Sequence, residues 1–371
     1  MTRVVLAGGG TGGHIFPMSA VARALRDAGV APAAMTFVGS RRGQERSLLG
    51  AEEIALVTLP GRGLRRSFSA RALGQNAVAL AGLALATLRA IVLFATWRPS
   101  VVVSFGGYAA LPAGLAAVLW RRPLVVVDLD ATSGATQRLL ARFADARCVS
   151  SEPSHARDVE TGVPLRPEIL AVARDVDSRR RARANFEPPI DEDRLVVVVM
   201  TGSLGARSVN DAVSELAHVW RGRRDLAIVH VAGRRDGERV RGAAPVLEGL
   251  DYRVLDFADM APLWAVADVA LCRAGATTVA ELAALGIAAV LVPLPGAPGD
   301  HQGLNARRLA AVGGALVLDD ADVSGESLAR ALGELLEDRH FDDVGERVRQ
   351  LARPRAAAAI AEVVARVGGL S

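Results

Sequence analysis

Three glycine-rich segments each follow a short apolar run, a placement typical of anion binding. They read GGGTGGH at residues 8–14, FGGY at residues 105–108 and TGSLGAR at residues 201–207. Glycine lets the backbone approach an anion closely, and a helix that begins there presents N–H groups and a positive dipole. We predict that these loops hold phosphate groups, the first two on one diphosphate. For any single loop, tight packing of a strand against a helix is the alternative.

The first segment also matches a dinucleotide-binding fingerprint, with Gly8, Gly10 and Gly13 at the three glycine positions. In NAD-binding proteins the second strand leads to an acidic residue that binds the ribose. Here that strand ends in GSRR at residues 39–42, which has no acid. Arginine in this place suits a 2′-phosphate, so an NADP-dependent enzyme stays open as a second interpretation.

The charge of the chain comes from arginine alone. All 44 basic residues are arginine, which excludes a lysine Schiff base and a lysine phosphate loop. A pI near 9.9 favours phosphate-rich or anionic-membrane partners, and an arginine-biased genome explains the composition equally well. No basic stretch interleaved with aromatic residues suggests nucleic acid. The two cysteines fit a reducing cytosol better than a disulfide framework.

The elements that position the glycine loops repeat in two halves. Short apolar runs alternate with helical patterns, which predicts parallel sheets covered on both faces. The expected strands are residues 3–7, 35–38, 54–59, 101–104, 124–127 and 147–149, then 195–200, 227–231, 252–255, 269–272, 288–293 and 315–317. We predict an α/β protein with two doubly wound, Rossmann-like domains facing across a cleft. The domains are residues 1–163 and 164–354, and a helix at 355–371 could pack back on the first.

One apolar segment, residues 77–96, is about as long as a membrane span. We expect a buried or interfacial helix instead, because a span between two strand-helix units would break the fold. Arginine surrounds the apolar side chains here, which suits a peripheral contact with an anionic membrane surface. The residues of this expected surface are Arg65, Arg66, Arg71, Arg89 and Arg98, with Leu83, Leu88, Ile91, Val92, Phe94, Trp97, Trp120, Arg121 and Arg122.

Five segments have a specific pattern: GGTGGHIFP at 9–17, SFGGYAALPAGLAA at 104–117, TGSLGARSVN at 201–210, CRAGATTVAELAALG at 272–286 and GDHQGLNA at 299–306. Together they resemble the MurG family, whose members transfer N-acetylglucosamine in peptidoglycan synthesis. The resemblance covers essentially the whole chain. It implies a GT-B fold and an inverting transfer from UDP-N-acetylglucosamine to undecaprenyl-diphosphate-linked N-acetylmuramyl-pentapeptide. It further implies no cofactor or metal, and a peripheral enzyme on the cytoplasmic face of the cell membrane.

The resemblance also assigns roles to residues. On the donor side, Ser203 would touch the diphosphate, Arg166 would compensate its charge, and Glu281 would accept from the ribose hydroxyls. The donor-binding residues it implies are Arg166, Ser203, Phe257, Ala276, Thr277, Glu281, His301 and Gln302. The acceptor diphosphate would lie at Gly10, Thr11, Gly12, Gly13, Gly106 and Gly107. The second domain would thus bind the UDP-sugar and the first the acceptor.

His14 is the candidate catalytic residue. It lies in the glycine loop near a helix start, where the positive dipole favours neutral imidazole. A neutral ring could accept the proton of the attacking hydroxyl. Binding the acceptor diphosphate is the equal alternative, and capping the helix is a third interpretation.

The stretch VDLDATSGATQ at residues 127–137 departs from the family pattern. Val127 and Asp128 replace a His-Glu pair, Asp130 replaces an asparagine, and Gln137 replaces a second asparagine. Because this region approaches the donor sugar in the family, the identity of the sugar or of the acceptor stays open. Asp128 and Asp130 also spell a D-x-D pair that binds metal in another fold, although we favour a metal-free site.

Other functions remain as alternatives. A paralogue could glycosylate a natural product or another lipid-linked sugar, which the altered stretch motivates. A protein of another class would bind lipid diphosphates without catalysis. A sugar-nucleotide epimerase of similar fold is conceivable, but its usual early Arg-Pro-Glu signature is absent after the first loop.

Overall fold

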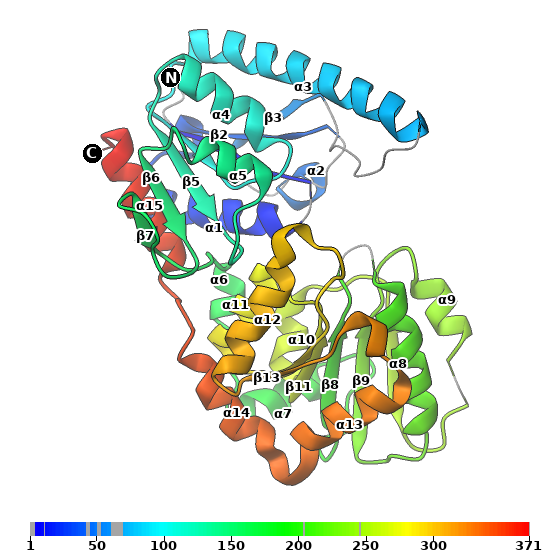
Figure 1. Ribbon diagram of the computed structural model, residues 1–371. Coiled ribbons are helices and arrows are strands. Elements are labelled where there is room, and N and C mark those ends of the chain that lie inside the picture. Colours follow the sequence, from blue (N-terminus) through cyan, green and yellow to red (C-terminus); the bar gives the residue numbers. More distant parts are fainter. Residues whose placement is uncertain are drawn as a thin grey trace. The chain divides into compact units, whose positions relative to one another are not determined.

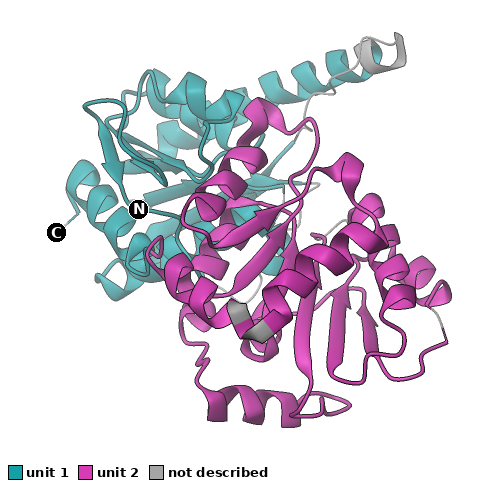
Figure 2. Cartoon of the chain, turned by 60° about the horizontal axis from the view of Figure 1, so that its bottom comes forward, with its two compact units in different colours: residues 1–166, 353–371 teal, residues 167–352 magenta. Residues whose placement is uncertain are grey.

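The computed structural model describes residues 4–10, 12–41, 45–49, 53–60, 70–202, 205–244 and 246–370. The chain forms two compact units, which are described separately here (Figure 1). Unit 1 contains Met1–Arg166 and Arg353–Ser371, and unit 2 contains Pro167–Ala352 (Figure 2).

Unit 1 has a seven-stranded parallel sheet in the order β3-β2-β1-β4-β5-β6-β7. The strands are β1 (Val4–Ala7), β2 (Met35–Ser40), β3 (Ala55–Leu59), β4 (Val101–Ser104), β5 (Leu124–Asp128), β6 (Ala146–Val149) and β7 (Asp158–Glu160). The central strands are apolar runs with every residue buried, as in a sheet covered on both faces. β7 was missed, because a half-buried edge strand of three residues has no apolar pattern.

Unit 2 has a six-stranded parallel sheet in the order β10-β9-β8-β11-β12-β13. The strands are β8 (Leu195–Met200), β9 (Leu226–Val231), β10 (Asp251–Leu255), β11 (Val269–Cys272), β12 (Ala288–Leu291) and β13 (Ala315–Val317). The order reverses beside the first strand of each sheet, as in Rossmann folds. The predicted fold class of two doubly wound domains is confirmed.

Helices cover both sheets. In unit 1 they are α1 (Gly12–Asp27), α2 (Glu45–Leu48), α3 (Ala70–Trp97), α4 (Ala110–Leu119), α5 (Ala135–Leu140) and α15 (Ala356–Gly368). In unit 2 they are α6 (Pro167–Leu170), α7 (Val176–Ala184), α8 (Arg207–Val219), α9 (Gly237–Gly242), α10 (Met260–Val266), α11 (Ala276–Leu285), α12 (His301–Ala311), α13 (Gly325–Leu336) and α14 (His340–Arg349). The short 3-10 turns are η1 (Pro32–Ala34), η2 (Pro298–Asp300), η3 (Asp320–Asp322) and η4 (Glu337–Arg339).

The long helix α3 lies beside α4 along the edge of unit 1 (Figure 1). Ala79, Ala86, Ala90 and Phe94 form its buried stripe, with the four- and seven-residue spacing of one helix face. Phe94 is 1% exposed, so the expectation that it contacts a membrane is wrong. By length and composition the stretch Gly74–Trp97 could cross a membrane, and 22% of its most apolar window is buried.

The C-terminal helix α15 belongs to unit 1, where it lies against α1, β4, β5 and β6. Gly162 allows the chain to return to unit 1 at Arg353, because a β-carbon at residue 162 would stand only 2.5 Å from the Arg353 side chain. Arg353 also binds Glu160 at 3.0 Å. The first segment of unit 1 ends at Arg166, three residues after the boundary expected from the sequence.

The charged stretch after Arg174 is bound to the base of the second sheet. The buried carboxylate of Asp268 accepts hydrogen bonds from Arg179 (2.9 Å), Arg183 (2.6 Å) and the backbone N–H of Val196 (2.7 Å). A carboxylate with three donors offsets much of the free energy lost when it leaves water. These arginines therefore stabilise unit 2.

Candidate functional site

The two glycine loops of unit 1 meet at the carboxyl ends of β1 and β4, which are neighbours in the sheet. Gly107 has φ of +75°, and a β-carbon on it would stand 2.5 Å from the carbonyl oxygen of Gly9. Only glycine permits this approach, because β-carbons essentially never come closer than 3.0 Å to another atom. α1 begins at Gly12, so its first N–H groups lie beside the joined loops.

His14 lies in the first turn of α1, against the second loop. Ideal β-carbons on Gly106 and Gly107 would be 3.5 Å from Cε1 and 3.4 Å from Cδ2 of its ring. The structure thus brings His14, Gly12, Gly13, Gly106 and Gly107 together, while Thr11 lies outside the described residues.

Gln137, one of the departures from the family pattern, joins the ends of β4 and β5. Its Oε1 accepts from the hydroxyl of Ser104 (2.7 Å), and its Nε2 donates to the carbonyls of Ser104 (3.0 Å) and Val127 (2.6 Å). Its side chain also lies beneath Gly106, where a β-carbon would be 3.5 Å away. Gln137 therefore supports the second glycine loop from inside the unit.

Glu45 was missed by the sequence reasoning, which sought an acid at the end of β2. Its buried Oε1 accepts from the N–H groups of Gly10 (3.0 Å) and Ser40 (2.8 Å). Gly9 and Gly39 leave the room for it, since β-carbons there would lie 1.9 Å and 2.7 Å from its side chain. The sequence signal that could have identified it is an acidic residue five positions after the end of β2. Glu45 closes the first glycine loop from inside the unit, and its carboxylate already accepts the Gly10 N–H.

The two acids of the D-x-D pair differ in burial. Asp128 is 5% exposed and Asp130 is half-buried. Asp128 accepts from the Ser133 hydroxyl at 2.7 Å and lies 3.4 Å from Nε of Arg147. Burial raises the pKa of Asp128, and the Ser133 bond and Arg147 oppose this. Across the described residues, no three His, Cys, Asp or Glu side chains gather to hold a metal ion.

Arg166 lies in unit 1, not in the domain where its expected donor-binding role placed it. Its guanidinium stands 4.3 Å from the centre of the Phe16 ring, on α1 two residues after His14. Such a cation–π contact contributes roughly 0.5–2 kcal/mol. The arginine is therefore held beside the start of α1.

The remaining expected donor residues follow the carboxyl ends of the strands of unit 2, where ligands of open α/β sheets bind. Ala276 and Thr277 begin α11 after β11, and His301 and Gln302 begin α12 after β12. Phe257 follows β10 and is 48% exposed. Ser203, after β8, lies outside the described residues.

These side chains already have intramolecular partners. The ring of Phe257 lies 4.5 Å from the guanidinium of Arg234. Nδ1 of His301 lies 2.9 Å from the carbonyl of Pro298, and Oε1 of Gln302 accepts from the N–H of Leu294 at 3.0 Å. In α11, Glu281 is 5% exposed, and its Oε2 accepts from the indole N–H of Trp264 at 2.8 Å.

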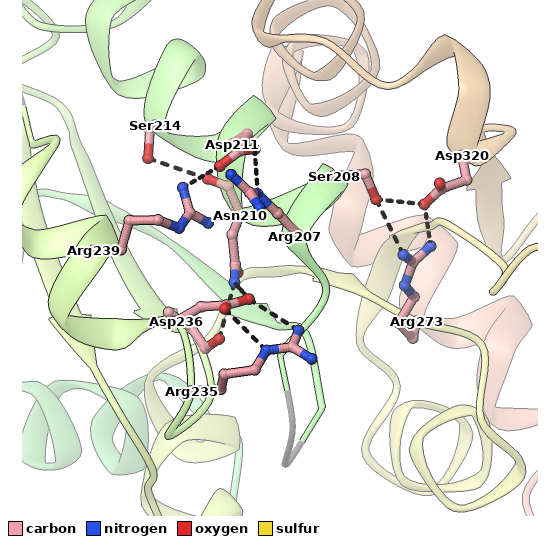
Figure 3. A network of polar contacts seen from close by, with 11 residues as sticks. Arg207, Ser208, Asn210, Asp211, Ser214, Arg235, Asp236, Arg239, Arg273 and Asp320 are labelled. Carbon is pink, nitrogen blue, oxygen red and sulfur yellow. Dashed lines mark hydrogen bonds and ion pairs between the residues drawn. The ribbon is translucent and has the colours of Figure 1, made fainter. Parts of the chain in front are cut away.

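A polar network supports the loop after β8 (Figure 3). Asn210 donates to the carbonyl of Ala232 (3.0 Å) and to Asp236 (3.1 Å), directly beneath Gly205. On the other side of the loop, Arg273 donates to the Ser208 hydroxyl at 3.2 Å and pairs with Asp320 at 2.6 Å. The start of α8 is thereby tied to the ends of β9 and β11.

His230 lies at the buried end of this network. Because the Asn210 amide N–H groups are used by Ala232 and Asp236, its Oδ1 accepts from Nε2 of His230 at 2.9 Å. Nδ1 then accepts from the Tyr252 hydroxyl, also at 2.9 Å. Burial lowers the pKa of His230 to about 3, so the ring is neutral.

Comparisons with known proteins agree along the whole chain. The N-terminal domain model of glycosyltransferase family 28 matches residues 4–149, and the C-terminal domain model of that family matches residues 196–360. A UDP-N-acetylglucosamine–N-acetylmuramyl-(pentapeptide) pyrophosphoryl-undecaprenol N-acetylglucosamine transferase of Alkalilimnicola ehrlichii is 39% identical over 368 residues, which are 97% of each chain.

Solved structures show the same likeness. The crystal structure of MurG of Acinetobacter baumannii has a TM-score of 0.75 and 29% identity, over 99% of this chain and 100% of that one. The UDP-GlcNAc 2-epimerase of Neisseria meningitidis has a TM-score of 0.68 over 99% of this chain and 100% of that one. Its identity is 12%, so it shares the fold alone.

Proposed function

The chain belongs to glycosyltransferase family 28 and to the MurG family within it, and from this membership we infer its reaction. The protein transfers N-acetylglucosamine from UDP-N-acetylglucosamine to undecaprenyl-diphosphate-linked N-acetylmuramyl-pentapeptide. The observation that carries this conclusion is the match to relatives of that activity over nearly the full length of both chains. The ensuing assignment of individual residues is our proposal.

We propose that the acceptor diphosphate binds at the joined glycine loops of unit 1. The residues are Gly10, Thr11, Gly12, Gly13, Gly106 and Gly107. Because the Gly10 amide is bonded to Glu45, the N–H groups at the start of α1 are the better donors. His14 adjoins both the helix start and the second loop, so it is our candidate for accepting the proton of the attacking hydroxyl.

We propose that the donor binds along the carboxyl edge of the second sheet. Glu281 accepts hydrogen bonds from the ribose hydroxyls. The uracil base binds at Phe257, and His301 and Gln302 contact the sugar hydroxyls. The partial positive charge at the start of α11, at Ala276 and Thr277, compensates the diphosphate charge together with the Ser203 hydroxyl. These positive groups supply what a metal supplies elsewhere, so we propose a reaction without metal or other cofactor.

The test is UDP release from UDP-N-acetylglucosamine in detergent with EDTA, with and without a lipid-linked muramyl-peptide analogue. We expect acceptor-dependent release and a disaccharide product. Donor binding without release would instead favour a paralogue with another acceptor. The altered stretch at residues 127–137 is the observation that suggests this alternative. Release that requires added Mg²⁺ would refute the metal-free proposal.

We also propose that α3 rests on the cytoplasmic face of an anionic membrane, with no span across it. Outside its buried stripe the helix carries apolar side chains that are 54–67% exposed: Val78, Leu80, Leu85, Leu88 and Val92. Leu119 and Trp120 extend this surface, and Trp120 is tied to α3 by a 2.9 Å bond from its indole to the Ile91 carbonyl. Exposed Arg89, Arg98 and Arg121 lie beside it.

The membrane proposal predicts that Leu88→Gln with Val92→Gln weakens binding to phosphatidylglycerol vesicles by about tenfold or more, since each side chain loses apolar burial in the bilayer. Val219→Gln, at a valine that is 51% exposed on α8 of unit 2, is the control and should bind normally. Cosedimentation measures the binding, and the thermal unfolding midpoint checks the fold. Unchanged vesicle binding by the double variant would contradict the proposal.

A further inference from the structure

The carboxylate of Glu281 accepts a hydrogen bond from a buried indole. Its Oε2 accepts the N–H of Trp264 at 2.8 Å, and Glu281 as a whole is 5% exposed. The indole donates a single N–H in a fixed direction, so it favours one orientation of the carboxylate. That orientation decides which edge of the carboxylate a ligand meets.

Trp264 is itself held in the core of unit 2. It is fully buried on α10, and α10 packs against α6, α7 and β8. Its backbone carbonyl accepts a hydrogen bond from the guanidinium of Arg174, which enters from the segment before α7. An indole held at ring and backbone cannot follow a moving carboxylate. The indole therefore restricts the orientation of the carboxylate.

Orientation decides what so buried a carboxylate can bind. To bind the vicinal hydroxyls of a ribose, the carboxylate must direct its lone pairs at the hydroxyl hydrogens, since hydrogen bonds weaken steeply when bent. With 5% of Glu281 exposed, a ligand meets this group from a narrow range of directions. A carboxylate turned about its last torsion, which is intrinsically broad, would present the wrong edge.

We propose that Trp264 is a positioning residue that aims the Glu281 carboxylate at the ribose hydroxyls and so makes the site selective for ribonucleotides. This rests on the proposed function, namely a UDP-sugar donor with Glu281 at its ribose. The selectivity follows because a 2′-deoxyribose leaves an oriented, buried acceptor without its hydrogen bond, which is strongly unfavourable.

The experiment compares the affinities of UDP and 2′-deoxy-UDP by titration calorimetry. We expect the wild-type protein to prefer UDP by about 10-fold or more, the range for a hydrogen bond to a charged group. Trp264→Phe removes the N–H and should bring the ratio of the two affinities close to one. Trp264→Tyr keeps a donor and should retain part of the preference. Trp220→Phe, at a tryptophan 6% exposed in the same unit, is the matched control and should keep the wild-type ratio.

The outcomes separate the inference from its premise. If wild-type protein binds no UDP, the proposed function fails and the inference with it. If wild type binds UDP and 2′-deoxy-UDP equally well, the positioning role is refuted and the function stands. The same holds if Trp264→Phe keeps the preference for UDP while both affinities or the unfolding midpoint fall. The chain has four tryptophans, so indole ¹⁵N–¹H spectra provide a second test on wild-type protein. UDP should shift the Trp264 signal more than 2′-deoxy-UDP does, and equal shifts would refute the inference even if Trp264→Phe fails to fold.

Discussion

Replacing Gly107 by alanine tests whether the two glycine loops of unit 1 work as one site. The new β-carbon would stand 2.5 Å from the carbonyl oxygen of Gly9. That neighbour is backbone, so it cannot turn aside as a flexible side chain can. The first loop and the second loop must separate, and His14, 3.4 Å from the same β-carbon, lies at the point of separation.

The magnitude follows from the geometry. A contact of 2.5 Å must open to at least 3.0 Å, so the loops move apart by no less than about 0.5 Å. A misplacement of about 1 Å near reacting groups can lower a rate by about 100-fold. We expect Gly107→Ala to lower kcat/KM for the lipid acceptor by about 10- to 100-fold, which is about 1.4 to 2.7 kcal/mol. The positive φ adds about 1–2 kcal/mol of lost stability.

Gly29→Ala separates the two effects. Gly29 has φ of +93°, follows α1 on the surface and has open space where its β-carbon would lie. It should lose similar stability and keep normal kinetics. Acceptor-dependent UDP release measures kcat/KM, calorimetry measures UDP affinity, and urea unfolding measures stability. Normal acceptor kinetics in a folded Gly107→Ala protein, or equal losses in both variants, would refute the reasoning.

Two further predictions concern histidines. His14→Ala should lower turnover by about 10²- to 10⁴-fold with UDP affinity unchanged, as expected for a lost general base, and full activity would exclude a catalytic role. His230→Gln should flatten the pH dependence of unfolding. The folded ring binds a proton only near pH 3 while the unfolded ring does so near 6.5, so wild type loses stability as the pH falls, by about 1 kcal/mol between pH 6.5 and 5.5. Urea unfolding at pH 6.5 and 5.5 measures it, and parallel pH curves for wild type and variant would contradict the argument.

The sheets were predictable because their strands are buried on both faces. Val4–Ala7 and Leu195–Met200 are apolar without interruption, so each run identifies a central strand wherever its neighbours lie. The glycine loops were predictable for a related reason, since a strand followed by glycine and a helix start occurs at the carboxyl edge of such sheets. Both signals are local in sequence.

Contacts between distant residues could not be predicted in this way. Glu45 reaches Gly10 across 35 positions, and Asp268 gathers arginines more than 80 positions away. A buried carboxylate looks like a surface one in sequence, because what distinguishes it is the number of donors that the fold brings to it. Phe94 was misplaced for the same reason, since one face of an apolar helix is indistinguishable from the other until α4 covers it.

The return of α15 to unit 1 has a consequence for synthesis on the ribosome. Residues 167–352 leave the exit tunnel before α15 does, so unit 2 has all of its residues while unit 1 still lacks one helix. Nascent domains fold as units, and an incomplete one exposes apolar surface. The sites that Ile360 and Val364 will fill beside α1 and the central strands stay open during that interval. A nascent chain held with residue 352 just outside the tunnel should therefore display a finished second unit and a first unit that chaperones recognise.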